Sequence, residues 1–286
     1  MITRGRLEMI LLNPFKSVEP KPARARQAEA RPEPTIRYAM HFTPRSGSSR
    51  LTDICKNAGN LGIPAEVFNK RLMIGIATAY GARNLKDFIY MTSRLHGTDG
   101  VFGFQITPAQ LHVLFLTSRR FMRLVRPTHH FWLLREDIVL QAISISRMLQ
   151  TSLSHSPYAD AQAMIRAEDS FRYDGTDFAN RVRSLTLMEQ TTERFFRRFR
   201  LSPLCMTYEA MNVWGEARTA RIVADHLGIA MQEGQEIHSD HKKVSGPKSN
   251  AFAERFRAEN ADLVAEVEAR RAPRMAEFAR QIDTLS

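Results

Sequence analysis

Hydrophobic and polar positions along the chain form two kinds of pattern, which alternate with each other. Short apolar runs that end in turns or polar residues predict β-strands over residues 35–42, 100–106, 129–134 and 203–211. Apolar residues at three- and four-residue spacing predict helices over residues 49–58, 137–153, 177–199, 215–228 and 251–283. Strands that alternate with helices are typical of a parallel sheet covered on both faces. We therefore expect an α/β fold with a central parallel sheet flanked by helices.

The first part of the chain has a different composition. Residues 1–34 are rich in Pro, Ala, Arg and Glu, which predicts a flexible basic extension that is extended or mobile. Residues 35–286 are then expected to form a single domain.

The chain is basic, with 41 Lys and Arg against 30 Asp and Glu and a net charge of +11. Such a charge favours an anionic partner: a nucleic acid, a phospholipid surface or a polyanionic nucleotide. Two clusters stand out, RFFRRFR at 194–200 and RRAPR at 270–274, and we interpret them as solvated basic surface. No RNP motif, zinc finger or clear helix-turn-helix pattern is present, so a nucleic acid is not the expected partner.

The cysteines and the lengths of the apolar runs indicate the cellular compartment in which the protein is expected. Cys55 and Cys205 lie far apart within apolar patterns, which indicates buried thiols of a reducing compartment. No apolar run approaches the about 20 residues of a membrane-spanning helix, and residues 1–17 lack the features of a secretory signal. A cytoplasmic protein is the expectation. No Cys or His spacing is typical of a metal site, so no metal is expected.

The sequence TPRSGSSRLT at 43–52 lies between a predicted strand and a predicted helix. A turn in this place directs several backbone N–H groups toward one point, where the helix dipole adds a positive potential. Gly47 allows a close approach of an anion to the backbone. The side-chain donors beside it are Arg45, Ser46, Ser48 and Ser49. The pattern predicts a phosphate-binding loop.

No lysine follows Gly47, although the phosphate loop of an NTPase or kinase would carry one. This difference argues against a nucleotide-dependent kinase of P-loop type, which stays an alternative. A turn that only connects strand to helix is another. A non-catalytic nucleotide- or polyanion-binding protein is the third, supported by the net charge.

A second candidate anion site follows the third predicted strand. Arg135 lies at the end of that strand, Asp137 is a natural N-cap, and Ser144 lies two turns into the next helix. Ligands of open α/β sheets bind at the carboxyl ends of the strands. We therefore expect Arg135 and Ser144 to supply a second set of anion donors.

Together these segments resemble the bacterial sulfotransferase family that contains trehalose 2-sulfotransferase and the lipopolysaccharide- and nodulation-type sulfotransferases. The motifs that carry the resemblance occur in the same order as in the family. They are RSGSSRL (45–51), GIPAEVF (62–68), GVFGFQ (100–105), REDIVLQAIS (135–144), CMTYEAM (205–211) and HKKVSGPKSNAFAERFR (241–257).

The resemblance implies a P-loop-like sulfotransferase fold and 3′-phosphoadenosine-5′-phosphosulfate as sulfuryl donor, without a metal. Residues 45–49 would surround the 5′-phosphosulfate, with Arg45 also acting in catalysis. Arg135 and Ser144 would bind the 3′-phosphate, and the basic loop with Lys242 and Lys243 would close over the nucleotide. Glu66 falls on the family's proposed catalytic base.

The resemblance also implies a hydroxyl acceptor on a carbohydrate or glycolipid, in-line transfer, and a homodimer. Peripheral contact with the inner face of the membrane is a further expectation, since the stretch FFRRF could face a membrane. The chain departs from the family at Gln105, where the family has a lysine. Histidines are alternative bases, because other sulfotransferases use histidine; among His96, His112, His129 and His130, the best placed is His96.

Overall fold

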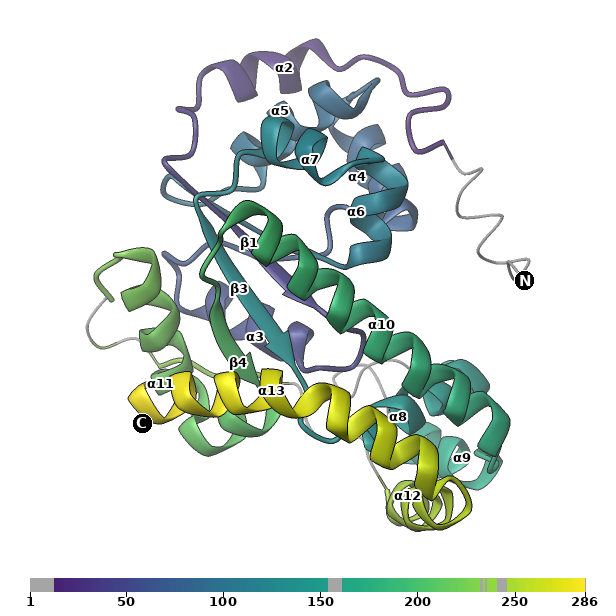
Figure 1. The fold of residues 1–286 in the computed structure, drawn as a ribbon. Coiled ribbons are helices and arrows are strands. Elements are labelled where there is room, and N and C mark those ends of the chain that lie inside the picture. Colours follow the sequence, from purple (N-terminus) through teal and green to yellow (C-terminus); the bar gives the residue numbers. More distant parts are fainter. Residues whose placement is uncertain (1–12, 154–160, 232–233, 235, 241–245, 286) are drawn as a thin grey trace.

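The computed structural model describes residues 13–153, 161–231, 234, 236–240 and 246–285. Its centre is a four-stranded parallel sheet with the strand order β2-β1-β3-β4 (Figure 1). The strands are β1 (Ile36–Phe42), β2 (Val101–Ile106), β3 (His129–Leu134) and β4 (Leu204–Thr207). Met40 of β1 lies opposite Gln105 of β2 and Phe131 of β3. The α/β fold with a central parallel sheet is confirmed.

Helices cover both faces of the sheet, because the buried strands carry apolar residues at successive positions. Tyr38, Met40 and Phe42 pack toward α3 (Ser48–Asn57) and α11 (Tyr208–Leu227). Ala39 packs on the opposite face. Helices with residues in that second cluster are α4 (Lys70–Tyr80), α5 (Leu85–Leu95), α6 (Pro108–Phe115), α7 (Ser118–Val125), α10 (Gly175–Phe199) and α13 (Ala261–Leu285).

A third apolar cluster lies beyond the carboxyl ends of the strands. It joins α8 (Ile138–Thr151), α12 (Pro247–Glu259) and Phe171, the residue after α9 (Ala161–Ser170), to the long helices α10 and α13. In Figure 1 the arrowhead of β3 points toward α13, the yellow helix. This arrangement surrounds the carboxyl edge of the sheet with helices.

Part of the segment expected to be extended is helical. α2 (Pro22–Glu29) begins with proline at its first turn and contacts α5, and Ala28 is fully buried. The expectation of an extended or mobile segment is therefore wrong for residues 22–29. Small alanines let this helix pack closely, whereas the composition alone predicted only a polar segment.

The other predicted elements are present, with changed boundaries. β4 ends at Thr207, and residues 208–211, expected as strand, begin α11, because the Thr207 hydroxyl accepts from the N–H of Ala210 and caps the helix. The helix expected over 251–283 is two helices that meet at Asn260. Helices α4 to α7 and α9 were not predicted.

The basic clusters are not uniformly solvated. Phe195 and Phe196 are buried, so the aromatic residues of RFFRRFR belong to the core, not to a membrane-facing surface. Arg271 and Arg274 of RRAPR are also buried and pair with the carboxylate of Glu189 on α10. The interpretation of this second cluster as solvated surface is wrong for these two arginines, because a buried carboxylate holds them.

The cysteines are buried free thiols, as predicted. Burial raises the pKa of the Cys55 and Cys205 thiols to about 12.

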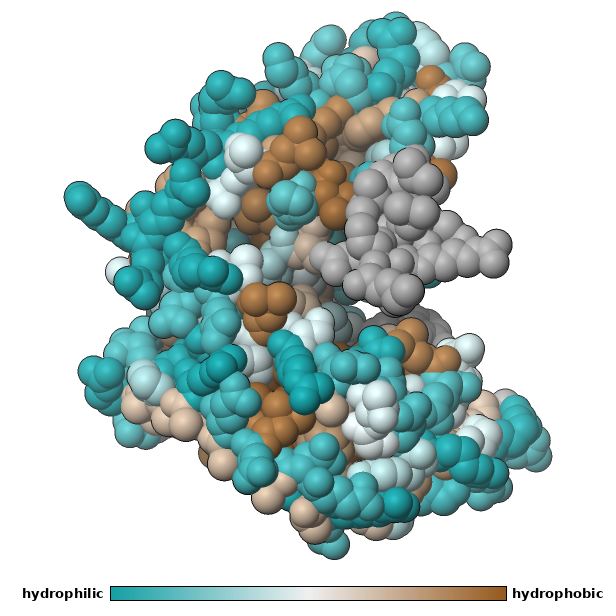
Figure 2. Space-filling model, turned by 45° about the vertical axis from the view of Figure 1, so that its right-hand side comes forward, coloured by the Kyte–Doolittle hydropathy of each residue, from teal (hydrophilic) through white to brown (hydrophobic). Residues whose placement is uncertain are grey.

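Hydrophilic side chains cover most of the face shown in Figure 2, and the largest exposed apolar patch lies in the upper half of that view. In the described part of the chain, no helix combines the length and the apolar character needed to cross a membrane.

Candidate functional site

The predicted phosphate loop connects β1 to α3 and has an unusual backbone conformation. Arg45 has a φ of 66° and Gly47 a φ of 87°, both in the left-handed region that favours glycine. Gly47 is the N-cap of α3, and no side chain caps this helix. The N–H groups of the first turn are therefore available to an anion at the positive end of the helix dipole.

The side chain of Tyr208, the first residue of α11, lies against this loop. A Cβ atom placed on Gly47 would come within 2.7 Å of the Tyr208 ring, so no larger residue fits without displacing the ring. The guanidinium of Arg135 lies 5.2 Å from the centroid of the same ring. Tyr208 thus connects the two anion sites that the sequence predicts.

Helix α8 holds the loop from the other side. The Gln141 amide donates to the Thr43 hydroxyl and to the Pro44 carbonyl, both at 2.8 Å. One helical turn later, the Ser144 hydroxyl accepts a hydrogen bond from Nε of Arg45 at 3.0 Å. Gln141 and Ser144 are three residues apart and lie on the same face of α8.

Three arginines converge at this place. Burial lowers the pKa of the Arg45 guanidinium, and the charges of Arg135 and Arg147 lower it further. Nε of Arg135 is buried without a hydrogen bond, 3.6 Å from a carboxylate oxygen of Glu209. Arg147 forms an ion pair with Glu168 at 3.1 Å. Arginines held together in this way repel one another, so a bound anion with several charges would stabilise them.

Glu66 is half-buried at the edge of the sheet beside β2. The N–H of Gln105 donates to the Ala65 carbonyl at 3.0 Å, which fixes the segment that carries Glu66 along the strand. The Glu66 carboxylate accepts from the amides of Asn69 and Gln110, both at 3.1 Å. Two neutral donors orient this carboxylate.

Gln105 connects Glu66's segment to the phosphate loop. Its amide donates to the Ser48 carbonyl at 2.9 Å and to the Thr52 hydroxyl. The Thr52 hydroxyl donates in turn to the Pro64 carbonyl at 2.7 Å. Gln105 is therefore a neutral, buried link between α3, β2 and the segment before Glu66.

A cavity of about 220 Å³ lies between α6, α7 and α10. Apolar side chains including Leu111 and Phe195 line it, and Arg194 and Arg198 contribute cationic groups. Leu111 is the neighbour of Gln110, whose amide contacts Glu66. Helix α6 therefore contributes both to the cavity lining and to the contact with Glu66.

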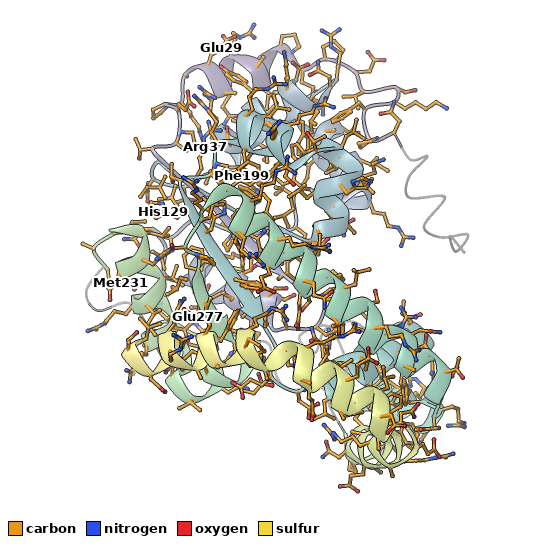
Figure 3. All side chains as sticks on the ribbon, viewed as in Figure 1. Glu29, Arg37, His129, Phe199, Met231 and Glu277 are labelled. Carbon is orange, nitrogen blue, oxygen red and sulfur yellow. The ribbon has the colours of Figure 1, made fainter. Side chains whose placement is uncertain are left out.

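The histidines considered as alternative bases have different surroundings. His130 contacts His41 at 3.2 Å between their ring nitrogens, in a buried aromatic environment that lowers the pKa of His130 to about 4. His129, labelled in Figure 3 at the amino end of β3, packs against His226 on the other face. Burial lowers the pKa of His96. His112 is exposed and lines the cavity. Only His129 and His130 lie at the amino end of a strand, which is the end remote from the loop.

The structure brings together most of the residues that the sequence singled out. Arg45, Arg135 and Ser144 surround one place next to the loop at 46–49, and Glu66 is linked to it through Gln105. Ser46 is fully buried and its hydroxyl has no partner. Lys242 and Lys243 lie outside the described residues.

The sequence analysis did not single out three residues of the site: Gln141, Arg147 and Tyr208. Gln141 and Arg147 lie three residues before and after Ser144, so the helical spacing of α8 could have indicated them. Tyr208 comes from a distant segment, and only its place in the motif CMTYEAM marks it.

The arrangement can bind an extended anion with negative charge at two positions. One position is the first turn of α3 with Arg45, and the other is Arg135 beside Tyr208. Within the described residues, no group of three His, Cys, Asp or Glu side chains is placed to hold a metal ion.

Comparison with known families agrees with this geometry. The model of the family described as Stf0 sulphotransferase matches residues 37–259, which include all of β1 but its first residue, the loop, Glu66, Arg135 and Ser144. A comparison with curated proteins gives no match. The match covers well over half of the chain, and the resemblance noted from the sequence is confirmed: the chain belongs to the Stf0 sulphotransferase family.

Proposed function

We propose that this sulfotransferase transfers a sulfuryl group from 3′-phosphoadenosine-5′-phosphosulfate to a hydroxyl group of a carbohydrate or glycolipid. The observation that carries the proposal is the convergence of Arg45, Arg135 and Ser144 beside an uncapped helix N-terminus. A donor with a phosphosulfate at one end and a separate phosphate at the other has the charge distribution that these groups favour.

Each group has a role in this proposal. The N–H groups of α3 and the Arg45 guanidinium bind the 5′-phosphosulfate, with Ser46, Ser48 and Ser49 nearby. Arg135 binds the 3′-phosphate, and Ser144 orients Arg45 and adds a hydroxyl donor. Lys242 and Lys243 are proposed to close over the nucleotide.

The transfer itself requires charge stabilisation and removal of one proton. The acceptor oxygen forms a bond to sulfur while the bond between sulfur and the 5′-phosphate oxygen breaks, and the products are a sulfate ester and adenosine 3′,5′-bisphosphate. Negative charge grows on the leaving phosphate, where Arg45 and the loop N–H groups donate. Glu66 takes the proton of the acceptor hydroxyl.

The cavity between α6, α7 and α10 supports an acceptor with an apolar portion. Its apolar residues Leu111 and Phe195 are suited to an alkyl or aryl group, and polar residues such as Thr191 and His112 are suited to sugar hydroxyls. The cavity shares α6 with the contact between Gln110 and Glu66. We infer that the apolar portion of a glycolipid lies in this cavity while its hydroxyl reaches Glu66.

Three further features are part of the proposal. Buried free thiols support a cytoplasmic, reducing location. A homodimer is inferred from the family. The exposed arginines at the end of α10, Arg194, Arg197 and Arg198, support peripheral contact with an anionic membrane.

Thermal unfolding in the presence of nucleotides tests the donor. Adenosine 3′,5′-bisphosphate at a hundred times its Kd is expected to stabilise the protein by about 2.7 kcal/mol, and ATP with magnesium is expected to stabilise it less. A larger shift with ATP and magnesium would favour the kinase alternative and overturn the proposal. A shift with the bisphosphate but no sulfate transfer to any acceptor would indicate a nucleotide-binding protein that does not catalyse transfer.

A further inference from the structure

The end of β3 is held by an arginine from α13. Nη1 of Arg271 donates to the Glu136 carbonyl at 2.7 Å, and Nη2 donates to the Arg135 carbonyl at 2.6 Å. Nε and Nη2 of the same guanidinium donate to the two carboxylate oxygens of Glu189 at 2.9 and 3.0 Å. One side chain therefore joins α13, α10 and the residue proposed to bind the 3′-phosphate.

This contact lies in the interior of the protein. The Glu189 side chain is 0% exposed and that of Arg271 is 4% exposed, so water does not compete for these hydrogen bonds. A buried carbonyl without a partner is costly, and the guanidinium satisfies two of them at once. Lysine could not reproduce the arrangement, because its ammonium lacks the planar fork of five donors.

The other restraints on this turn come from the opposite side. The N–H of Glu136 donates to Glu209 at 2.9 Å, and the Thr207 hydroxyl donates to the Glu136 carboxylate at 2.7 Å. Both partners belong to β4 and α11. From α13, Arg271 holds the Arg135 carbonyl of the same peptide unit and the Glu136 carbonyl of the next one, so the backbone that carries the Arg135 side chain is fixed from two directions.

We propose that Arg271 is a positioning residue for the 3′-phosphate of the donor, and that α13 is therefore part of the donor site. This inference rests on the proposed function. The family match ends at residue 259, before α13 begins, so the family model does not include this contribution. Arg271 acts through Arg135: it fixes the direction of the guanidinium and does not itself touch the nucleotide.

Arg274 provides a matched control on the same helix. It also donates to Glu189, at 2.9 Å, and its side chain is also 4% exposed. Its second ion pair is with Glu193, and within the described part of the chain it forms no hydrogen bond to the carbonyls at the end of β3. Arg271→Met and Arg274→Met each leave Glu189 with one arginine, but only Arg271→Met also leaves the Arg135 and Glu136 carbonyls without their donor.

The experiment compares two ligands by calorimetry: adenosine 3′,5′-bisphosphate and AMP, which lacks the 3′-phosphate. In Arg271→Met we expect the Kd of the bisphosphate to rise about tenfold, a loss typical of a misplaced charge-assisted contact. The Kd of AMP is expected to stay within about threefold of the wild-type value. Arg274→Met is expected to leave the ratio of the two Kd values unchanged.

A double-mutant cycle tests whether the effect passes through Arg135. In an Arg135→Met background, adding Arg271→Met is expected to cause no further loss of bisphosphate affinity. If Arg271→Met does not fold, Arg271→Lys, which retains a cation beside Glu189, takes its place, with a smaller loss again confined to the bisphosphate.

Two results would overturn the inference, because a purely structural role predicts them. One is an equal loss of affinity for the bisphosphate and AMP in Arg271→Met. The other is the same change in the ratio of the two Kd values in Arg274→Met. Failure of the proposed function would look different: the wild-type protein would then fail to prefer the bisphosphate over AMP.

Discussion

Arg45 and Ser144 are 99 residues apart in sequence and are joined by a hydrogen bond of 3.0 Å between Nε and Oγ. The bond connects the left-handed residue of the loop to the helix that follows β3. It fixes the plane of the Arg45 guanidinium before any ligand binds. Because a pre-oriented donor loses less conformational entropy on binding, this bond is expected to contribute to donor affinity.

Ser144→Ala removes this contact with little change of volume. We expect the affinity for adenosine 3′,5′-bisphosphate to fall by about five- to tenfold, corresponding to about 1 kcal/mol for one hydrogen bond. Calorimetric titration measures the change. Ser146→Ala on the same helix is the control, because Ser146 contacts Gln150 and not the loop. An unchanged Kd in Ser144→Ala would contradict the role of this hydroxyl.

Glu66→Gln separates binding from transfer. The amide oxygen of glutamine can still accept from Asn69 or Gln110, so the local structure is expected to be retained. A neutral amide cannot take the proton, and we expect sulfate transfer to fall by at least about a hundredfold, as for the loss of a general base. Radiolabelled sulfate incorporation and the bisphosphate Kd are measured together. Retained turnover would remove Glu66 from the role of base.

Leu111→Trp fills part of the cavity between α6, α7 and α10. We expect the wild-type protein to have a higher kcat/KM for octyl glucoside than for glucose, because the alkyl chain buries apolar surface at about 25 cal/mol per Å². The substitution is expected to remove this preference without changing the bisphosphate Kd. Leu187→Trp, at an exposed position of α10, is the control. A preference that survives in Leu111→Trp would place the acceptor elsewhere.

The paired histidines of β1 and β3 predict a loss of stability at acidic pH. Burial lowers the pKa of His41 and His130, so both are neutral in the folded protein, and the unfolded chain binds protons that the folded protein does not. The stability they provide is complete above a pH of about 6.5 and decreases as the pH falls toward about 4, the folded pKa of His130. Protonation linked to His130 is expected to lower the free energy of unfolding by about 3 kcal/mol over this pH range.

Denaturant unfolding at several pH values measures how steeply the free energy of unfolding changes with pH. His41→Leu with His130→Leu is expected to make the free energy of unfolding less dependent on pH in this range, although the variant is less stable overall. A wild-type slope that does not change when both buried histidines are replaced would assign the pH dependence to other groups.

Much of the fold could be predicted from the sequence, because the strands of a buried parallel sheet are short apolar runs. His129 to Leu134 was predicted with its exact boundaries since polar residues flank it on both sides. β4 was extended too far because Tyr208 to Met211 is apolar enough for a strand, and only the cap at Thr207 decides for a helix. Helices α4 to α7 were missed although their starts carry local signals, such as the Thr107–Gln110 capping box of α6 and the Thr117 cap of α7.

The candidate site was predicted in part for a similar reason. Arg45, Ser144 and Arg135 lie next to strand ends or on a helix face, where local pattern indicates position. Tyr208 reaches Gly47 from a segment more than 150 residues away, and its place depends on the parallel order of the strands. Arg271 was interpreted as a solvated charge because its partner Glu189 lies on another helix.

The contact between Arg271 and the Arg135 carbonyl also has a consequence for the order of folding. The two residues are 136 positions apart, so β1, β3 and their neighbouring helices can be synthesised and can pair before the arginine leaves the ribosome. Contacts of such separation carry a large loop-closure entropy and form late. A nascent chain would thus acquire its sheet first and its binding competence only afterwards, and ligand-free intermediates ending before α13 should accumulate with the end of β3 still unrestrained.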